Sequence, residues 1–133
     1  MICVDTTFLI DLWRHRHIQD HPSVALLRGA GGETFAVPAH AAGEFLEGVA
    51  CISQERFQEA LVFLALFIIG TMSLETAKRY AAVVSDLRGR SLLQGASKPD
   101  LWIAAWALEH GARLATRNRK HFENVPELHL IAY

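Results

Sequence analysis

Short and long apolar segments alternate along the chain, and they predict an alternation of strands and helices. Short runs that would form buried strands lie at 2–5, 34–38, 68–72, 112–116 and 128–133. Segments with apolar residues every three or four positions predict helices at 7–14, 22–28, 38–49, 53–67, 74–89 and 98–110. Strands that alternate with helices are typical of an α/β fold with a mainly parallel sheet, covered by helices on both faces.

Residues that cap helices support these boundaries. Ser53 and Ser73 precede two of the helical segments, and Ser97 or Lys98 begins the last one. The glycines of "RGAGGE" could cradle a phosphate, but no Lys-Ser/Thr signature follows them. We therefore interpret them as a helix stop followed by a turn.

Composition limits the class of protein. The 133 residues fit a single domain spanning 1–133, and 51% of them are hydrophobic while 20% are charged, which is typical of a globular chain. The net charge is −1, whereas a protein that coats polyanions is basic. Any contact with nucleic acid must therefore be local.

The two cysteines and the apolar runs bear on location. Cys3 and Cys51 lie in apolar segments and are expected to be buried free thiols, which suits a reducing cytoplasm. Asp5 and Asp11 interrupt the first apolar run, so we expect no signal peptide. The uncharged run at 60–72 is too short to cross a bilayer as a helix, so no membrane contact is expected.

Three acidic residues occupy unusual positions. Asp5 ends a buried strand in "VDTTFLIDL", Glu44 interrupts an apolar helix in "VPAHAAGEFLEGV", and Asp100 opens an apolar helix in "SKPDLWIAAW". Each has an ordinary explanation: Asp5 as a helix cap, Glu44 as part of an exposed helix face, and Asp100 as half of a capping box with Ser97. None of these explanations accounts for their joint placement toward the carboxyl ends of the strands, where parallel sheets bind ligands.

Carboxylates that lie close together repel, and a cation allows them to stay ionised. Carboxylate oxygens suit hard ions such as Mg²⁺ or Mn²⁺, which support hydrolysis of phosphodiesters. A zinc site is less consistent with the sequence. His15 and His17 are closely spaced, but no second Cys or His pair completes the pattern, so we expect both to be solvated.

At four places the sequence resembles the PIN domain of VapC-type toxins: "VDTTFLIDL" at 4–12, "EFLEG" at 44–48, "DLWIAAWALEHG" at 100–111 and "LATRNRKHF" at 114–122. The resemblance implies a three-layer α/β/α fold and a metal-dependent endoribonuclease that inhibits translation. It also implies that Asp5, Glu44 and Asp100 are the catalytic acids and the ligands of Mg²⁺ or Mn²⁺.

The same resemblance implies roles for neighbouring residues. Thr6 or Thr7 would orient Asp5 by a hydroxyl hydrogen bond, and Thr116 would act similarly near the site. Many family members carry a fourth acid where this chain has Asn118. An amide oxygen can bind a metal or its water but adds no charge, so the departure bears on a second metal.

Basic residues flank the acidic motifs and could bind RNA phosphates: Arg14, Arg16, Arg117, Arg119 and Lys120. The alternative is that each is an ordinary solvated loop charge. Trp13 could stack on a base of single-stranded RNA, although a core position is the more ordinary expectation.

The segment 54–67 is more apolar than packing against a small sheet requires, so part of it is expected to contact another chain. The resemblance implies a homodimer and a small antitoxin protein as partners. The plain alternative is that all of this surface is core.

Other classes share parts of the pattern. A PIN-like module that binds RNA or protein without cutting would fit Asn118. A haloacid dehalogenase-type phosphatase needs a second Asp two residues after the first, where Thr7 stands. A receiver domain needs an acidic pair and a lysine at strand ends, and the sequence shows neither clearly.

Overall fold

Five parallel strands form the centre of the molecule. The structure, a computed structural model, describes residues 1–133. The strands are β1 (Ile2–Val4), β2 (Phe35–Pro38), β3 (Ile68–Gly70), β4 (Arg113–Ala115) and β5 (Leu130–Ile131), in the order β3-β2-β1-β4-β5. Every pair is parallel, so the sequence-based expectation of a mainly parallel sheet is confirmed.

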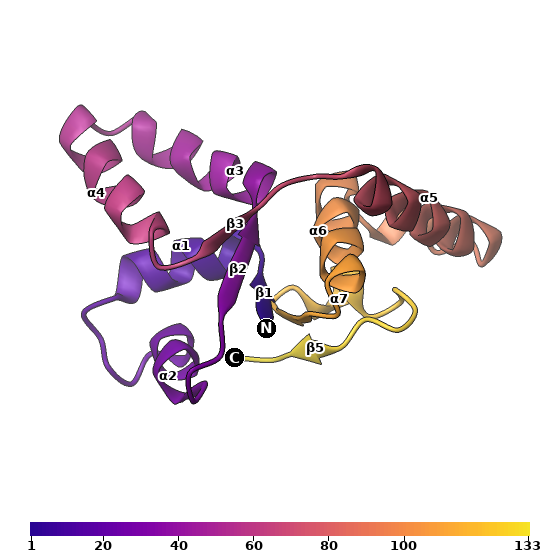
Figure 1. Cartoon of the computed structure of the whole chain (residues 1–133), viewed down its shortest axis with the longest axis horizontal. Coiled ribbons are helices and arrows are strands. Elements are labelled where there is room, and N and C mark those ends of the chain that lie inside the picture. Colours follow the sequence, from indigo (N-terminus) through magenta and orange to yellow (C-terminus); the bar gives the residue numbers. More distant parts are fainter.

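Helices cover both faces of the sheet. They are α1 (Thr6–His15), α2 (Pro22–Gly29), α3 (Ala39–Ala50), α4 (Gln54–Leu64), α5 (Leu74–Gly89), α6 (Lys98–Glu109) and α7 (Arg119–Phe122), with a short 3₁₀ helix at Leu93–Gly95. Figure 1 shows the sheet nearly edge-on, with α1 to α4 on one side and α5 to α7 on the other. The arrangement is the three-layer α/β/α fold that the sequence predicted.

Burial follows the apolar pattern. All of β1 is buried, and six residues of α6 are buried, as expected for a helix that is apolar on nearly all sides. The run at 60–72 divides into the end of α4 and the strand β3. No helix of the structure has the length and apolar character needed to span a membrane.

Some expectations about elements were wrong. The helix predicted at 53–67 ends at Leu64, and the next three residues form turns that return the chain to β3. The last strand spans only Leu130–Ile131 of the predicted 128–133, and the short helix α7 was not predicted. Cys51 is exposed rather than buried, because α3 ends one residue before it; Cys3 is buried as expected.

Gly70 shows how closely the edge strand β3 packs on α6. A Cβ atom at Gly70 would lie 2.4 Å from the Trp106 ring. The same edge of the ring is held in place, because its Nε1 donates a hydrogen bond to the Thr71 carbonyl at 3.2 Å. Only glycine leaves room for this contact.

Candidate active site

The strand order creates a switch point between β1 and β4. From β1 the chain builds outward through β2 and β3, and it then crosses to the other side of β1 to place β4 and β5. Crevices outside the carboxyl ends of strands at such a point are the usual ligand sites of open α/β sheets. Asp5 follows β1 and Thr116 follows β4, so the two residues meet at this crevice.

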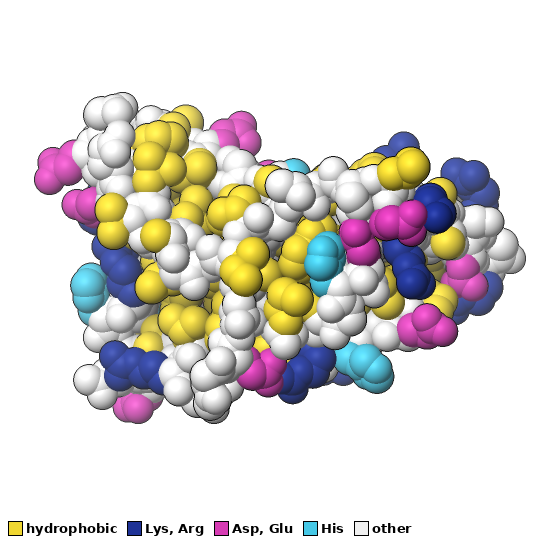
Figure 2. Space-filling view, in the orientation of Figure 1, with side chains coloured by type: hydrophobic (Ala, Val, Ile, Leu, Met, Phe, Trp, Pro, Cys, Tyr) yellow, Lys and Arg dark blue, Asp and Glu magenta, His cyan; other side chains and the backbone are white.

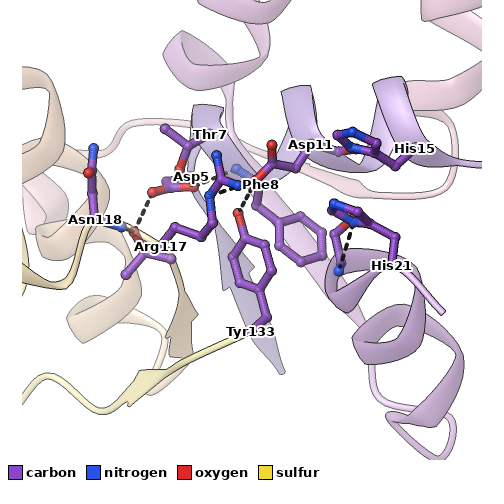
Figure 3. A network of polar contacts seen from close by, with 11 residues as sticks. Asp5, Thr7, Phe8, Asp11, His15, His21, Arg117, Asn118 and Tyr133 are labelled. Carbon is purple, nitrogen blue, oxygen red and sulfur yellow. Dashed lines mark hydrogen bonds and ion pairs between the residues drawn. The ribbon is translucent and has the colours of Figure 1, made fainter.

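Asp5 is almost completely buried, with 2% of its surface exposed, and its carboxylate accepts three hydrogen bonds (Figure 3). Its Oδ1 accepts from the Thr7 hydroxyl at 2.7 Å and from the Phe8 backbone N–H at 2.8 Å. Its Oδ2 accepts from the Thr116 hydroxyl at 2.6 Å. The bond to Phe8 makes Asp5 the N-cap of α1, so the helix-cap explanation is correct as far as it goes.

Burial raises the pKa of the Asp5 carboxyl, and the nearby Asp100 carboxylate raises it further. The three hydrogen bonds act in the opposite direction and only partly offset this rise. The ionised form of Asp5 is therefore less favoured in the protein alone than it is in water. A cation beside it would remove that penalty.

Asp100 does not complete a capping box. Its backbone N–H donates to Ser97 Oγ at 3.2 Å, which caps α6. Its carboxylate turns to His121 instead, with 2.7 Å between Oδ2 and Nδ1. His121 comes from α7, the helix that was not predicted, and sequence analysis gave it no role. Helix capping therefore explains the backbone of Asp100 but not its carboxylate.

Glu44 lies on the exposed face of α3, and a hydrogen bond links it to the first turn of α1. The Thr6 hydroxyl donates to Glu44 Oε2 at 2.6 Å. Thr6 directly follows Asp5, so it connects the two acidic residues. Of the two threonines considered for orienting Asp5, Thr7 bonds to it and Thr6 bonds to Glu44.

The three acids do not form a closed ligand cluster, because no three Asp, Glu, His or Cys side chains lie close enough together to hold one ion. Each carboxylate nevertheless keeps acceptor capacity. Asp5 Oδ2 has one protein donor, and Asp100 Oδ1 and Glu44 Oε1 have none. This donor set fits a hard divalent cation that is held by one or two carboxylates and keeps several waters.

Thr116 and Asn118 lie just after β4 and form the side of the site opposite α1, where Thr116 contacts Asp5. Thr116 is fully buried, and its hydroxyl oxygen accepts a hydrogen bond from the Asn118 backbone N–H at 2.9 Å while donating to Asp5. The Asn118 residue itself is exposed on this side of the site. The loop after β4 thus holds Thr116 in the orientation that Asp5 requires.

Asp11, on α1, is a second buried acid near Asp5. The sequence pattern gave it no role in the site. Its Oδ2 accepts from the Tyr133 hydroxyl at 3.0 Å and pairs with Arg117 Nε at 3.0 Å (Figure 3). Burial and the Asp11 carboxylate raise the pKa of Tyr133. Arg117 is therefore paired within the protein and is not a free cation.

The other basic residues differ in availability. Arg14, Arg119 and Lys120 are exposed. Arg16 instead lies 3.9 Å above the centre of the Trp13 ring. Trp13 is half-buried and packs edge-on against Phe45 and Phe63 at the margin of the core. With Arg16 above its ring, it is not free to stack on an RNA base.

The histidines expected to be solvated also differ from one another. His17 is exposed. His15 is half-buried, stacks on His21 with 3.9 Å between ring centres, and has Nδ1 2.9 Å from the Asp11 carbonyl oxygen. His15 therefore has a packing role at the end of α1.

Comparisons with known proteins agree with this fold. The sequence matches the family described as "PIN domain" over residues 2–128. Ribonuclease VapC1 of Methanocaldococcus jannaschii is 32% identical, and the match covers 99% of this chain and 86% of that protein.

Two solved structures have the same architecture. VapBC2 from Rickettsia felis, bound to a DNA fragment from its promoter, contains a chain that is 26% identical, with a TM-score of 0.83 over 100% of this chain and 99% of that one. A toxin–antitoxin complex from Klebsiella pneumoniae contains a chain that is 24% identical, with a TM-score of 0.76 over 98% of this chain and 96% of that one.

Proposed function

Because this chain belongs to the PIN domain family, we propose that it is a metal-dependent endoribonuclease and the toxin of a toxin–antitoxin pair. The observation that carries the proposal is the state of Asp5. This carboxylate is buried at the switch point and is fixed by three hydrogen bonds, and its charge is disfavoured by burial and, to a smaller extent, by Asp100. A buried acid with this environment is suited to holding a metal ion.

Asp5 and Asp100 would hold Mg²⁺ or Mn²⁺, and Glu44 would be the third acid of the site. Such a cation polarises a phosphoryl oxygen and makes water a better nucleophile at neutral pH. Thr7 and Thr116 keep Asp5 in one orientation, and Thr6 does the same for Glu44. Orientation by such hydrogen bonds is worth about 10–100-fold in metal affinity or activity at known metal sites.

RNA would cross the acidic site between exposed cations on its two sides, with Arg14 near the end of α1 and with Arg119 and Lys120 on α7. Their charges offset the acidic centre for an incoming phosphate chain. Arg117 would contribute by holding the loop after β4 beside Asp5, through its ion pair with Asp11. Cleavage of RNA needed for protein synthesis would arrest translation.

The exposed apolar surface supports protein partners. Figure 2 shows apolar side chains gathered over the side of the molecule that carries α4 and β3. Val62, Leu66 and Ile68 are the most exposed of them, at 75%, 62% and 53%. We expect a small antitoxin protein and a second copy of this chain as partners, and we expect the toxin to act in the cytoplasm, where its free thiols stay reduced.

The decisive experiment incubates the purified chain with bulk RNA in the presence of Mg²⁺, Mn²⁺ or EDTA. We expect fragments to accumulate with either metal and to be absent with EDTA. Preparations of Asp5→Asn made in parallel exclude a contaminating nuclease. Binding of RNA without cleavage under every metal condition would instead identify a non-catalytic binding module.

A further inference from the structure

A cleft of about 570 Å³ opens beside Glu44. Of the residues that line it, only Glu44 has a role in the proposed catalytic site. The cleft is lined by six residues: His40, Glu44, Met72, Lys98, Pro99 and Trp102. They come from the start of α3, the segment before α5 and the first turns of α6. Its volume lies within the range of about 300–1,000 Å³ that is usual for small-ligand sites.

Trp102 gives the cleft an aromatic wall. The ring is half-buried and lies outside the hydrophobic core, although its neighbours Leu101 and Ile103 are buried. It stacks on Tyr80 with 4.2 Å between ring centres and an angle of 7° between planes. The stack covers one face of the indole and fixes its orientation, and Trp102 lines the cleft while Tyr80 does not. Met72 and Pro99 add further apolar surface.

The cleft is preformed, because a hydrogen bond joins its two sides. His40 on α3 lies with Nε2 3.1 Å from the Pro99 carbonyl oxygen at the start of α6. The carbonyl can only accept, so Nε2 carries the proton. The other ring nitrogen, Nδ1, is buried without a hydrogen-bond partner. Ring and backbone therefore form one fixed wall next to Glu44.

The polar lining is cationic opposite the acid. Lys98 is exposed at the first position of α6 and forms no ion pair. Glu44 is the one carboxylate in the cleft, and it is held by Thr6. A ligand that combines a flat apolar group with a negative charge would match Trp102 and Lys98 together.

We infer that this cleft binds an unstacked nucleobase of single-stranded RNA, next to the phosphodiester that is cut. The inference rests on the proposed nuclease function and assigns it a substrate subsite. Proteins bind single strands by stacking aromatic side chains on the bases and by placing basic side chains against the backbone phosphates. Since the cleft shares Glu44 with the acidic site, the base that it holds would fix which bond lies at the carboxylates.

The first test measures binding alone. A fluorescently labelled single-stranded RNA is titrated with the protein in EDTA, so that no cleavage occurs. We expect Trp102→Leu to raise Kd about 10-fold, the typical effect of losing one stacked base, and Trp102→Phe to restore most of the affinity. Unchanged affinity in a folded Trp102→Leu protein would overturn the proposal.

Lys98 offers a second test that does not disturb the core. Lys98→Gln is compared with Arg88→Gln, which removes the same charge from the last turn of α5, at a residue that does not line the cleft. We expect Lys98→Gln to weaken RNA binding and Arg88→Gln to leave it within twofold. Equal effects would mean that only net charge matters and would contradict a built site.

The last test locates the base. With Mg²⁺ or Mn²⁺, RNA oligonucleotides carrying an abasic nucleotide at each position in turn are cleaved by the parent chain and by Trp102→Leu. We expect the parent chain to lose activity at one position beside the cut, and Trp102→Leu to be insensitive there.

The outcomes separate this inference from the proposed function. Failure of every metal to support cleavage, with Trp102-dependent binding intact, would remove the nuclease proposal and keep the subsite. A change in molecular mass of Trp102→Leu by light scattering, with RNA affinity unchanged, would show that another protein chain covers the cleft and would overturn the subsite.

Discussion

At the scale of single residues, Asp5 serves both as a helix cap and as a buried acid whose charge the protein disfavours. We predict that Asp5→Asn lowers RNA cleavage at least about 100-fold, because a metal contributes several kcal/mol to such reactions. The amide oxygen still accepts from Thr7 and Phe8, and Nδ2 can donate to the Thr116 hydroxyl oxygen in place of the bond that Oδ2 accepts in the parent. The variant also lacks the charge that burial and Asp100 disfavour. Without metal, its melting temperature should therefore equal or exceed that of the parent by a few °C.

Scanning calorimetry with and without Mn²⁺ checks both parts of this prediction. Mn²⁺ should raise the melting temperature of the parent chain and leave Asp5→Asn unchanged, since only a bound ligand stabilises the folded state. An equal rise in both proteins would show that the ion binds elsewhere.

Glu44 and Glu47 lie three residues apart on α3, and both are exposed. Only Glu44 contacts the site, through Thr6. We predict that Glu44→Gln lowers cleavage at least about 10-fold, within the range for residues that orient metal sites. Glu47→Gln, the matched control, should keep most activity. Comparable losses in the two variants would contradict the assignment of Glu44.

Asn118 tests the charge balance at the end of β4. Three carboxylates cannot neutralise two divalent ions, so a second ion should bind poorly without substrate. Asn118→Asp adds a charge, and at an effective dielectric of about 20 a unit charge roughly 4 Å away is worth about 4 kcal/mol before desolvation. If only about 1.4 kcal/mol of this electrostatic energy remains after desolvation, the Kd for Mn²⁺ should fall about 10-fold, as measured by titration calorimetry. Unchanged affinity and stoichiometry would mean that residue 118 does not face the ions.

At the scale of elements, the Glu109 carboxylate at the end of α6 links this helix to the start of α5 by hydrogen bonds. Glu109 accepts hydrogen bonds from Ser73, at 2.8 Å, and from Thr76. Burial alone would raise the pKa of Glu109, but the bonds from Thr76 and Ser73 outweigh it and hold the pKa below its usual 4.5. The ionised form is thus favoured in the folded state. Its stabilisation is complete above pH 4.5 and is lost as the pH falls through the lowered pKa.

We predict that Glu109→Gln lowers the free energy of unfolding by about 1 kcal/mol at pH 7, as for other hydrogen bonds to charged groups. Urea denaturation between pH 7 and pH 3 measures the difference from the parent chain. The difference should shrink once the pH is below 4.5, because the parent then loses the same charge. A difference independent of pH would contradict the electrostatic origin.

At the scale of the whole molecule, a net charge of −1 restricts RNA binding to a few local cations. With Arg117 paired to Asp11, the exposed candidates are Arg14, Lys98, Arg119 and Lys120. Each phosphate contact with single-stranded RNA contributes about −0.7 to the slope of log K against log salt. We predict a slope of roughly −3 for four contacts, made less steep by about 0.7 in Arg119→Gln.

Anisotropy titrations in EDTA at several salt concentrations give these slopes. Arg88→Gln, at the far end of α5, serves as the control and should keep the parent slope. A slope that is unaffected by Arg119→Gln would remove this residue from the RNA path.

Local sequence was sufficient for most of the fold, because hydrophobic periodicity and helix caps act within a few residues. It predicted the parallel sheet and the buried helix α6, and the caps at Ser53, Ser73 and Ser97 are all present. It failed where the ends of elements depend on distant partners. The segment after Leu64 leaves its helix to pair with β2, and the short α7 owes its position to contacts with α6.

For the site, the sequence by itself determined which acids stand at the ends of elements, since strand ends and helix starts are local features. The family resemblance implied that Thr116 acts near the site, but only the tertiary structure paired Thr116 with Asp5, Thr6 with Glu44 and His121 with Asp100. The Asp11 network and the cleft beside Trp102 are also tertiary features, which join segments far apart in the chain. Hydrogen bonds and burial between such segments depend on strand order and helix packing, which no local pattern encodes.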